Sequence, residues 1–202
     1  MLAGVTVRPY TMRARADAVA GTRARIVAAA LALGEDTRSV DLTLDAVAAR
    51  AEVGVRTVLR HFGSRDGLLD AVFAAGRAEV EAERLAPEGD VDAALTTLVA
   101  HYERRGDFVM HLLAQEGTEP RIDALLAGGR ALHRRWVTGV FGPWLLDPGA
   151  ESLVDLLVVA TDVYAWKLLR RDRGLSAADT TTRLRRLVDA VLAHHGKQDA
   201  HV

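Results

Sequence analysis

The sequence reads TLDAVAARAEVGVRTVLRHF from Thr43 to Phe62, and the expectations for the rest of the chain follow from this stretch. Thr43 can cap a short helix that runs to about Arg50, because its hydroxyl can accept a hydrogen bond from the first turn. The chain then breaks at residues 52–54. A second short helix is predicted to end at Phe62, with Val58 on its inner face. Two short helices joined by a tight turn indicate a helix-turn-helix.

A helix-turn-helix makes specific demands, and this stretch meets them. Ala48 is small enough to lie where the two helices cross. Val53 can fill the corner between them, and Gly54 is compact enough for the turn. The second helix must expose polar and basic groups that can reach the major groove of DNA. Its outward candidates are Arg56, Thr57, Arg60 and His61.

The flanking sequence predicts helices on both sides of this motif. A first helix is expected over residues 17–33, where Gly34 can stop it, and a fourth over residues 64–84. Five more are predicted after it, the first two separated by Gly106 and the last opened by a capping box at residues 176–179. They cover residues 91–105, 107–116, 120–145, 150–172 and 177–195. The chain is therefore predicted to be all-α, with about nine helices.

The amino-acid composition excludes some kinds of site and indicates one kind of partner. The chain has 202 residues and no cysteine, which excludes disulfides, thiolate metal sites and cysteine nucleophiles. Its net charge of −1 conceals an asymmetry, because residues 1–65 carry +4 and residues 66–202 carry −5. A basic segment on an acidic remainder indicates a polyanionic partner at the basic segment alone, and a chance fluctuation is the alternative.

Motifs for metal binding, catalysis and membrane insertion are missing from the sequence. The histidines are scattered, without a carboxylate partner at helical spacing, so neither a metal site nor a cofactor is expected. No phosphate-binding loop, nucleophile elbow or dinucleotide fingerprint occurs, so an enzyme is not expected. The most apolar stretch, residues 153–169, contains charged residues and is interpreted as a core helix. With no targeting signal, the expected location is the cytoplasm.

The stretch from Ala51 to Leu69 resembles the DNA-binding signature of TetR-family repressors. That signature is an Ala-Gly-Val-Ser turn, a Thr-Leu-Tyr-x-His-Phe recognition helix and a Ser-Lys-Glu-x-Leu-Leu start to the fourth helix. The resemblance covers about residues 22–73. The matching positions are Ala51, Val53, Thr57, Arg60, His61, Phe62, Ser64 and Leu69.

Four positions depart from the signature. Glu52 stands where the family usually has glycine, and Gly54 stands where a serine normally caps the recognition helix. Leu59 replaces a tyrosine that typically meets a phosphate, so one backbone contact is lost. Arg65 replaces the usual lysine and keeps its charge.

The resemblance implies a flexible basic arm at residues 1–20, a helix-turn-helix domain at 21–70 and a ligand-binding and dimerisation domain at 71–202. Arg56 and Thr57 are assigned to base edges or adjacent phosphates, and the other contacts to phosphates. His61 could instead be a packed residue at the helix junction, and Arg60 a solvated charge. The residues expected at the DNA are Thr43, Gly54, Val55, Arg56, Thr57, Arg60, His61 and Arg65.

For residues 71–202, the resemblance implies a small organic ligand among the middle helices and a homodimer through the last two. The alternative is that the apolar faces of these last helices complete the core of a monomer. Aromatic and polar side chains of the middle helices are the pocket candidates, and for each a place in the core is the alternative. They are His101, Phe108, His111, Gln115, Trp136 and Tyr164.

The function expected from the resemblance is that of a dimeric regulator, a repressor on a palindromic DNA operator that a small organic effector releases. The alternative is an all-helical small-molecule-binding protein with a degenerate DNA-binding segment. Glu52, Gly54 and Leu59 motivate that alternative, because each departs from the signature.

Overall fold

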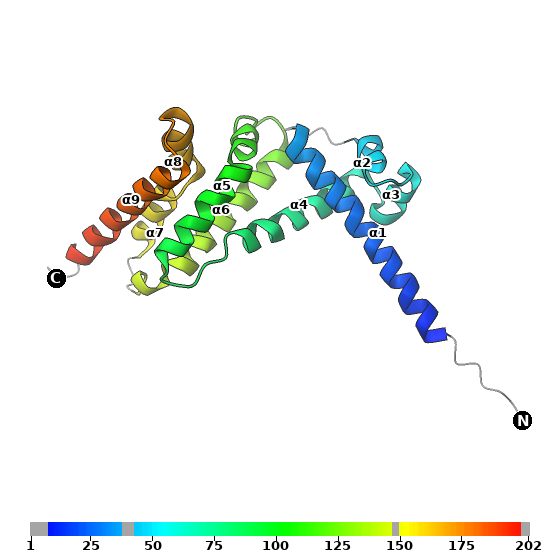
Figure 1. Ribbon diagram of the computed structural model, residues 1–202, viewed down its shortest axis with the longest axis horizontal. Helices are drawn as coiled ribbons and strands as arrows, with labels where there is room; N and C mark the ends of the chain where they lie inside the picture. The colour runs from blue at the N-terminus through cyan, green and yellow to red at the C-terminus, as the bar shows by residue number, and fades with distance from the viewer. Residues whose placement is uncertain (1–7, 38–42, 147–149, 199–202) are drawn as a thin grey trace, which may run out of the picture. The chain divides into compact units, whose positions relative to one another are not determined.

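The computed structural model describes residues 8–37, 43–146 and 150–198, and most of them are helical (Figure 1). The helices are α1 Arg8–Thr37, α2 Leu44–Arg50, α3 Val55–Phe62, α4 Arg65–Glu83, α5 Val91–Leu113, α6 Pro120–Val140, α7 Glu151–Ala160, α8 Val163–Lys167 and α9 Ala177–Gln198. A 3₁₀ turn, η1 (Gly142–Trp144), follows α6, and a π-helical turn, η2 (Leu168–Asp172), follows α8. The described residues contain no strand, and the predicted all-α class is confirmed.

The chain divides into two compact units, Met1–Gly76 and Arg77–Val202. They are named the N-terminal unit and the C-terminal unit below. Helix α4 is continuous across this division, because it runs from Arg65 to Glu83. Each unit has a hydrophobic core of its own.

The N-terminal unit buries one small core between α1, α2, α3 and the start of α4. Ile26, Val47, Val58 and Leu69 are buried in it, and α2 packs against both α1 and α3. The two short helices of the predicted helix-turn-helix are therefore present. The predicted cap of α2 is confirmed, because the Thr43 hydroxyl accepts a hydrogen bond of 3.2 Å from the Ala46 backbone N–H.

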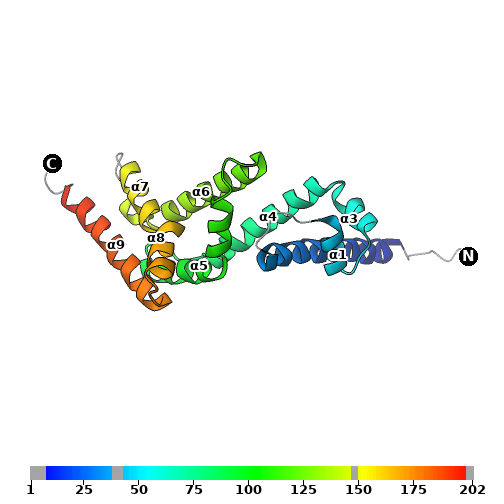
Figure 2. The ribbon, with the colours of Figure 1, turned by 90° about the horizontal axis from the view of Figure 1, so that it is seen from above.

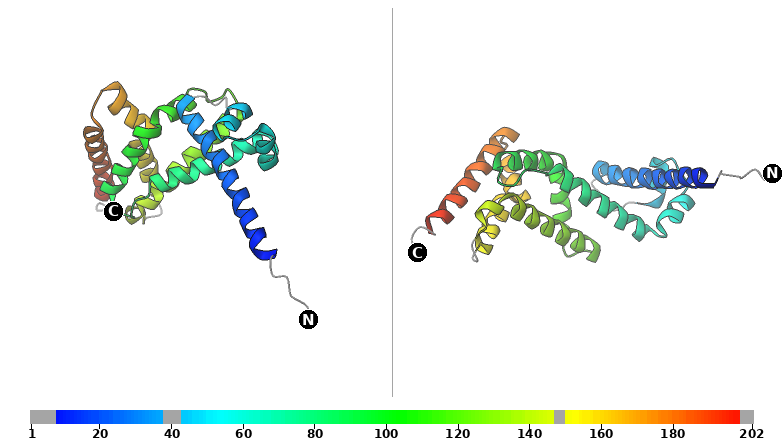
Figure 3. Two further views of the ribbon diagram at one scale, coloured as in Figure 1. Left: turned by 45° about the vertical axis from the view of Figure 1, so that its right-hand side comes forward. Right: turned by 90° about the horizontal axis from the view of Figure 1, so that it is seen from below.

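Helix α1 is longer than the sequence analysis predicted. It begins at Arg8 and includes residues 8–20, which were assigned to a flexible arm; residues 1–7 lie outside the described part. Its first half extends past α2 and α3 (Figure 3), and residues 12–20 are all exposed. Apolar periodicity does not predict a helix here because residues 12–20 are exposed, whereas their alanines and arginines have high helix propensity. Gly34 lies inside the helix and does not end it.

In the C-terminal unit, α5 is the central helix. It packs against α6, α8 and α9, and α7 packs against α6 and α9 (Figure 2). Leu95 and Leu98 of α5, Leu157 of α7 and Leu184 and Val188 of α9 are fully buried in the core between these helices.

The predicted break at Gly106 is wrong, since α5 runs without interruption from Val91 to Leu113. Gly106 is buried, and a Cβ atom at this position would lie 2.5 Å from the indole ring of Trp166. The glycine is therefore needed for a close approach between α5 and α8. A glycine inside a helix reduces its stability but does not end it when the flanking residues pack well.

The single helix predicted over residues 150–172 is also wrong. Helix α7 ends at Ala160, and Asp162 then caps α8 by accepting a hydrogen bond of 2.9 Å from the Tyr164 N–H. Helix α9 opens as predicted, because the Ser176 hydroxyl accepts a hydrogen bond of 3.0 Å from the Asp179 N–H. A local side-chain cap thus fixes the start of both helices.

Candidate functional site

The turn between α2 and α3 places the second helix of the motif. The Val53 N–H donates to the Ala48 carbonyl over 2.9 Å, and the Thr57 N–H donates to the Gly54 carbonyl over 2.8 Å. Glu52 has a φ of +54°, and it is the only described residue other than glycine with positive φ. The turn therefore requires the left-handed conformation at the position where the family pattern has glycine, and Glu52 adopts it at a cost.

Helix α3 has an apolar inner face and a basic outer face. Val58 is fully buried in the core of the N-terminal unit, whereas Arg56 and Arg60, four residues apart, are both exposed. Among the described residues, neither of these arginines is paired with a carboxylate. Leu59 lies on the same outer side and is 37% exposed. The outer face of α3 is therefore positively charged, with one apolar side chain within it.

The other residues predicted to contact DNA lie on and around α3. Thr43 is exposed beside the start of α2, and Arg65 is exposed at the start of α4. Gly54 is the cap residue of α3 and forms no side-chain cap bond. Thr57 and His61 are half-buried, so each could contact both the core and a partner. Val55 is also half-buried and packs against the core.

Arg23 of α1 supports α3, a role that the sequence analysis missed. Its guanidinium donates a hydrogen bond of 2.8 Å to the His61 carbonyl, in the last turn of α3. The same guanidinium lies over the Phe62 ring, 4.3 Å from its centre. A cation at a helix C-terminus satisfies a carbonyl that the helix itself leaves unpaired. This contact could not be predicted from the sequence, because the two partners lie far apart along the chain.

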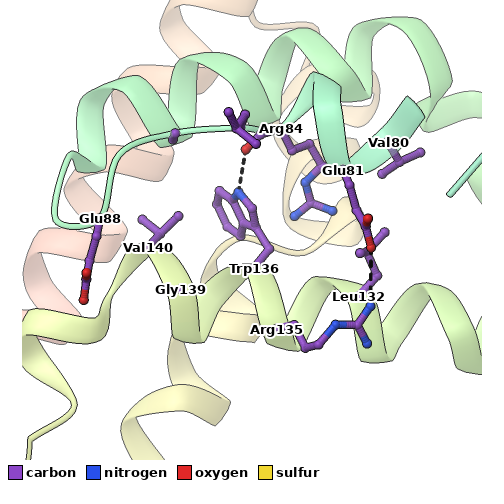
Figure 4. Close-up of a pocket in the computed structure, with 11 residues that line it drawn as sticks. Val80, Glu81, Arg84, Glu88, Leu132, Arg135, Trp136, Gly139 and Val140 are labelled. Atoms are coloured by element: carbon purple, nitrogen blue, oxygen red, sulfur yellow. Dashed lines mark hydrogen bonds and ion pairs between the residues drawn. The ribbon is translucent and has the colours of Figure 1, made fainter. Parts of the chain in front are cut away.

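A cavity of about 370 Å³ opens in the C-terminal unit. Its walls come from the end of α4, the loop that follows and one side of α6 (Figure 4). Trp136 is the only residue in this wall that the sequence analysis had assigned to a pocket. The lining residues are Val80, Glu81, Arg84, Leu85, Ala86, Glu88, Leu132, Arg135, Trp136, Gly139 and Val140.

The other predicted pocket residues lie away from this cavity. His101 is buried, and its Nδ1 lies 2.7 Å from a Glu83 carboxylate oxygen. His111 is exposed, and its carbonyl accepts a 3.2 Å hydrogen bond from the half-buried Gln115 side chain. Phe108 is half-buried, and Tyr164 is 50% exposed on α8. For His101, the alternative of a place in the interior matches its position.

A polar network meets the cavity at two residues of its wall, Arg84 and Trp136. The Arg84 guanidinium donates to His133 Nδ1 over 2.6 Å, and the Trp136 indole N–H donates to the Arg84 carbonyl over 2.9 Å. His133 Nε2 lies 3.1 Å from the Thr161 hydroxyl, which in turn donates to the Leu157 carbonyl over 2.7 Å. The network thus joins the end of α4 to α6 and to the end of α7.

The two buried histidines are held neutral. Burial lowers the pKa of His133 to about 3, and the positive charge of Arg84 adds to this effect. Burial also lowers the pKa of His101 to about 4, although its hydrogen bond to Glu83 acts in the opposite direction. An arginine can only donate, so His133 must accept at Nδ1 and carry its proton on Nε2. At neutral pH, neither histidine therefore adds a second positive charge beside Arg84.

In residues 8–37, 43–146 and 150–198, no cluster of three or more acidic and histidine side chains is arranged to hold a metal ion. Within the same ranges, no helix is both long and apolar enough to cross a membrane.

A segment that lies within α1 to α4 is similar in sequence to a known protein family. Residues 26–72 match the family described as "Bacterial regulatory proteins, tetR family". In structure, the chain is similar to a crystal structure from Rhodococcus sp. described as a "putative TetR-family transcriptional regulator". The TM-score is 0.60 at 19% identity, over 85% of this chain and 99% of the other. This likeness shows a shared fold. No curated protein matches in sequence.

Proposed function

We propose that this chain, whose residues 26–72 match the tetR family, is a DNA-binding transcriptional regulator that binds a palindromic operator as a dimer and releases it when a small organic effector binds. The observation that carries the proposal is the outer face of α3. It exposes Arg56 and Arg60 on a short helix whose other side is fixed in a core. A helix of this kind can enter the major groove, where arginine pairs with the edge of guanine.

The residues around α3 have two proposed tasks. Arg56 and Thr57, in the first turn of α3, read base edges or adjacent phosphates. Thr43, Arg60 and Arg65 contact phosphates, and these contacts fix the position of the helix on the duplex. His61, Gly54 and Val55 complete this interface through the backbone or a half-buried side chain. The exposed first half of α1 adds positive charge beside the interface, since Arg13 and Arg15 lie on it.

The proposed dimer forms through α7, α8 and α9. The inward side chains of these helices complete the core of the C-terminal unit, yet several large apolar side chains on the same helices stay exposed. An exposed apolar set on adjacent helices is typical of a self-association surface. A dimer presents two copies of α3 to two half-sites, which raises affinity above that of one helix-turn-helix. The exposed set on these helices is Leu156, Val159, Tyr164 and Leu187, and Leu168 at the start of η2 is exposed as well.

The proposed effector site is the cavity lined by the end of α4, the loop that follows it and α6. Its location favours coupling to DNA binding, because α4 starts directly after α3 and ends beside the cavity. An effector that prefers one arrangement of the chain over another shifts the population toward it, and only this difference in affinity can release DNA. The proposal places the protein in the cytoplasm as a repressor without enzymatic activity.

The second candidate is a small-molecule-binding protein whose DNA-binding segment is degenerate. Two observations favour it: Glu52 adopts a strained backbone conformation in the turn, and the exposed Leu59 offers no hydrogen bond to a phosphate. Both candidates share the cavity and differ in whether α3 binds DNA.

Selection of bound sequences from a random pool of duplex DNA distinguishes the two candidates. The full-length protein is tested beside Arg56→Ala and beside Arg173→Ala, a control that removes an exposed arginine of the C-terminal unit. A regulator enriches a palindrome with half-sites about 34 Å apart, and Arg56→Ala alone loses it. A folded, dimeric protein that enriches no sequence is instead the degenerate form.

A further inference from the structure

We propose that the cavity in the C-terminal unit binds an organic carboxylate and that the Arg84 guanidinium neutralises its charge. This inference rests on the proposed function, because it names the chemical class of the effector that the proposed regulator would bind.

Arg84 is a buried cation without an anion. Its side chain is 5% exposed, and in the part of the chain that the structure describes, its Nε atom has no hydrogen-bond partner. Its contacts are the neutral ring of His133 and the face of Trp136, whose centre lies 4.6 Å from the guanidinium carbon. None of the described carboxylates forms an ion pair with it. Removing a charge from water without pairing it costs several kcal/mol, and binding an anion would recover part of that cost.

The charges around Arg84 support this assignment. Burial lowers the pKa of Arg84, and the raising effects of Tyr102 and Asp162 do not reverse this. Burial also raises the pKa of Tyr102 well above its ordinary value, so this phenol is uncharged at neutral pH. An arginine is protonated under all ordinary conditions. The site therefore holds one unneutralised positive charge.

The walls of the cavity are suited to an apolar body. Val80, Leu85, Leu132 and Val140 line it together with the indole of Trp136. A volume of about 370 Å³ lies within the range of sites for small organic ligands, which is roughly 300–1,000 Å³. A carboxylate attached to a short alkyl chain or to an aromatic ring combines the required charge with this lining.

The remaining charged side chains of the wall do not replace Arg84. Glu81 and Arg135 compensate each other across 3.6 Å. Glu88 is exposed to water on the far side of Trp136 from that pair (Figure 4). Its repulsion of a bound anion is therefore screened by solvent. Arg84 is thus the group in this wall that gains most from an anionic ligand.

Trp136 partly shields the guanidinium with which a ligand would pair. The indole is half-buried, covers one face of Arg84 and is held by one hydrogen bond to the Arg84 carbonyl. The neighbouring Leu85 is 78% exposed and packs on little else. A carboxylate that enters the cavity would replace the cation–π contact with a charge-assisted hydrogen bond, which is the stronger interaction.

The experiment compares each acid with its own amide by isothermal titration calorimetry on the full-length protein at pH 7. The probes are 1-naphthoate with 1-naphthamide and octanoate with octanamide. We expect at least one acid to bind about tenfold or more tightly than its amide, because only the acid pairs with Arg84. In Arg84→Gln, this preference should fall to about onefold while amide binding stays. The control is Arg135→Gln, which removes a cation of the same wall and should keep the preference.

Each other outcome overturns the inference. It is wrong if the acid and amide bind the unmodified protein equally, if neither binds, or if the preference for the acid survives in Arg84→Gln. Should Arg84→Gln fail to fold, Arg84→Lys decides: it keeps the charge but loses the planar fork, and a preference unchanged from that of arginine would contradict a direct contact. The titrations contain no DNA, so failure here leaves the DNA selection of the proposed function untouched.

Discussion

Arg56 and Arg60 of α3 are exposed and have no carboxylate partner among the described residues, whereas many arginines of the C-terminal unit are held by acidic side chains. Arg130 pairs with Glu116 over 2.6 Å, and Arg171 pairs with Asp107 over 2.9 Å. The two units therefore use the same residue type for different purposes. In the C-terminal unit, acidic side chains neutralise the charge of many arginines. On α3 the charge of the two arginines remains available to a polyanion. Arg84 differs from these paired arginines, because it is buried, lines the cavity and has no carboxylate partner among the described residues.

The largest expected effect tests this contrast directly. Arg56→Ala combined with Arg60→Ala should weaken DNA binding by roughly 30- to 20,000-fold, because each of the two lost contacts to a base or phosphate removes about 1–3 kcal/mol. The slope of log affinity against log salt should also become shallower by about 1 for each lost phosphate contact. Fluorescence anisotropy on the selected duplex, measured at several salt concentrations, provides both values.

The matched control for that pair is Arg130→Ala, since Arg130 is also exposed but is neutralised by Glu116. It should leave both the affinity and the salt slope unchanged. If Arg130→Ala weakened DNA binding as much as the α3 variant does, net charge alone would control the affinity, and the contrast between paired and unpaired arginines would not hold.

The second prediction concerns the stability of the folded chain as the pH falls. His133 and His101 have pKa values of about 3 and about 4 in the folded chain, below the value of 6.5 expected when unfolded. The unfolded state therefore binds more protons below pH 6.5, so stability is present above that pH and is lost as pH falls toward 4. Each histidine contributes a slope of at most about 1.4 kcal/mol per pH unit. Urea unfolding at pH 7, 6 and 5, followed by tryptophan fluorescence, measures this loss.

Two variants test whether His133 causes the loss of stability in acid. His133→Gln keeps an oxygen that can accept from Arg84 but does not titrate, so its stability should fall less steeply with acid. His194→Gln, on the exposed face of α9, should behave like the unmodified protein. All three tryptophans lie in the C-terminal unit, so fluorescence reports on the unit that contains His133. An unchanged slope in His133→Gln would contradict the assignment.

The third prediction tests the packing of the C-terminal unit. Gly106→Ala places a Cβ atom 2.5 Å from the Trp166 ring, and should destabilise this unit by about 1–3 kcal/mol. Gly129→Ala is the matched control, because Gly129 also lies inside a helix but has nothing within 4 Å of its missing Cβ. It should stabilise the protein by up to about 1 kcal/mol. Equal destabilisation by both substitutions would refute the close approach of α5 and α8.

The separation along the chain between residues that contact each other explains what could be predicted from the sequence. The turn and the two helices around it depend on residues within a few positions of each other, so α2, α3 and the cap at Thr43 were predictable. Gly106 and Trp166 are distant along the chain, and a glycine required by such a contact is indistinguishable in sequence from one that ends a helix. Arg84 was missed as a cavity residue for the same reason, since the residues that it contacts, His133 and Trp136, come from α6.

The fourth prediction moves to the N-terminal unit, where the departures from the family pattern affect the backbone. Glu52→Gly should stabilise this unit by up to about 1 kcal/mol, because glycine adopts a φ of +54° without the steric cost that glutamate bears. Glu52→Ala should bring no such gain, since alanine bears a similar cost. Amide hydrogen exchange in α3 measures the change without relying on tryptophan. A gain with alanine equal to that with glycine would attribute the effect to the removed charge.

The smallest expected effect concerns the start of α3. Gly54 has a φ of −79° and open space around its missing Cβ, so a serine fits there without strain. Gly54→Ser should stabilise α3 by a few tenths of a kcal/mol through a side-chain cap, and Gly54→Ala, which offers no acceptor, should not. Hydrogen exchange at the first turn of α3 distinguishes the two. If the serine slows exchange and also tightens DNA binding, the rigidity of α3 limits recognition. If it slows exchange alone, affinity is governed by the exposed arginines.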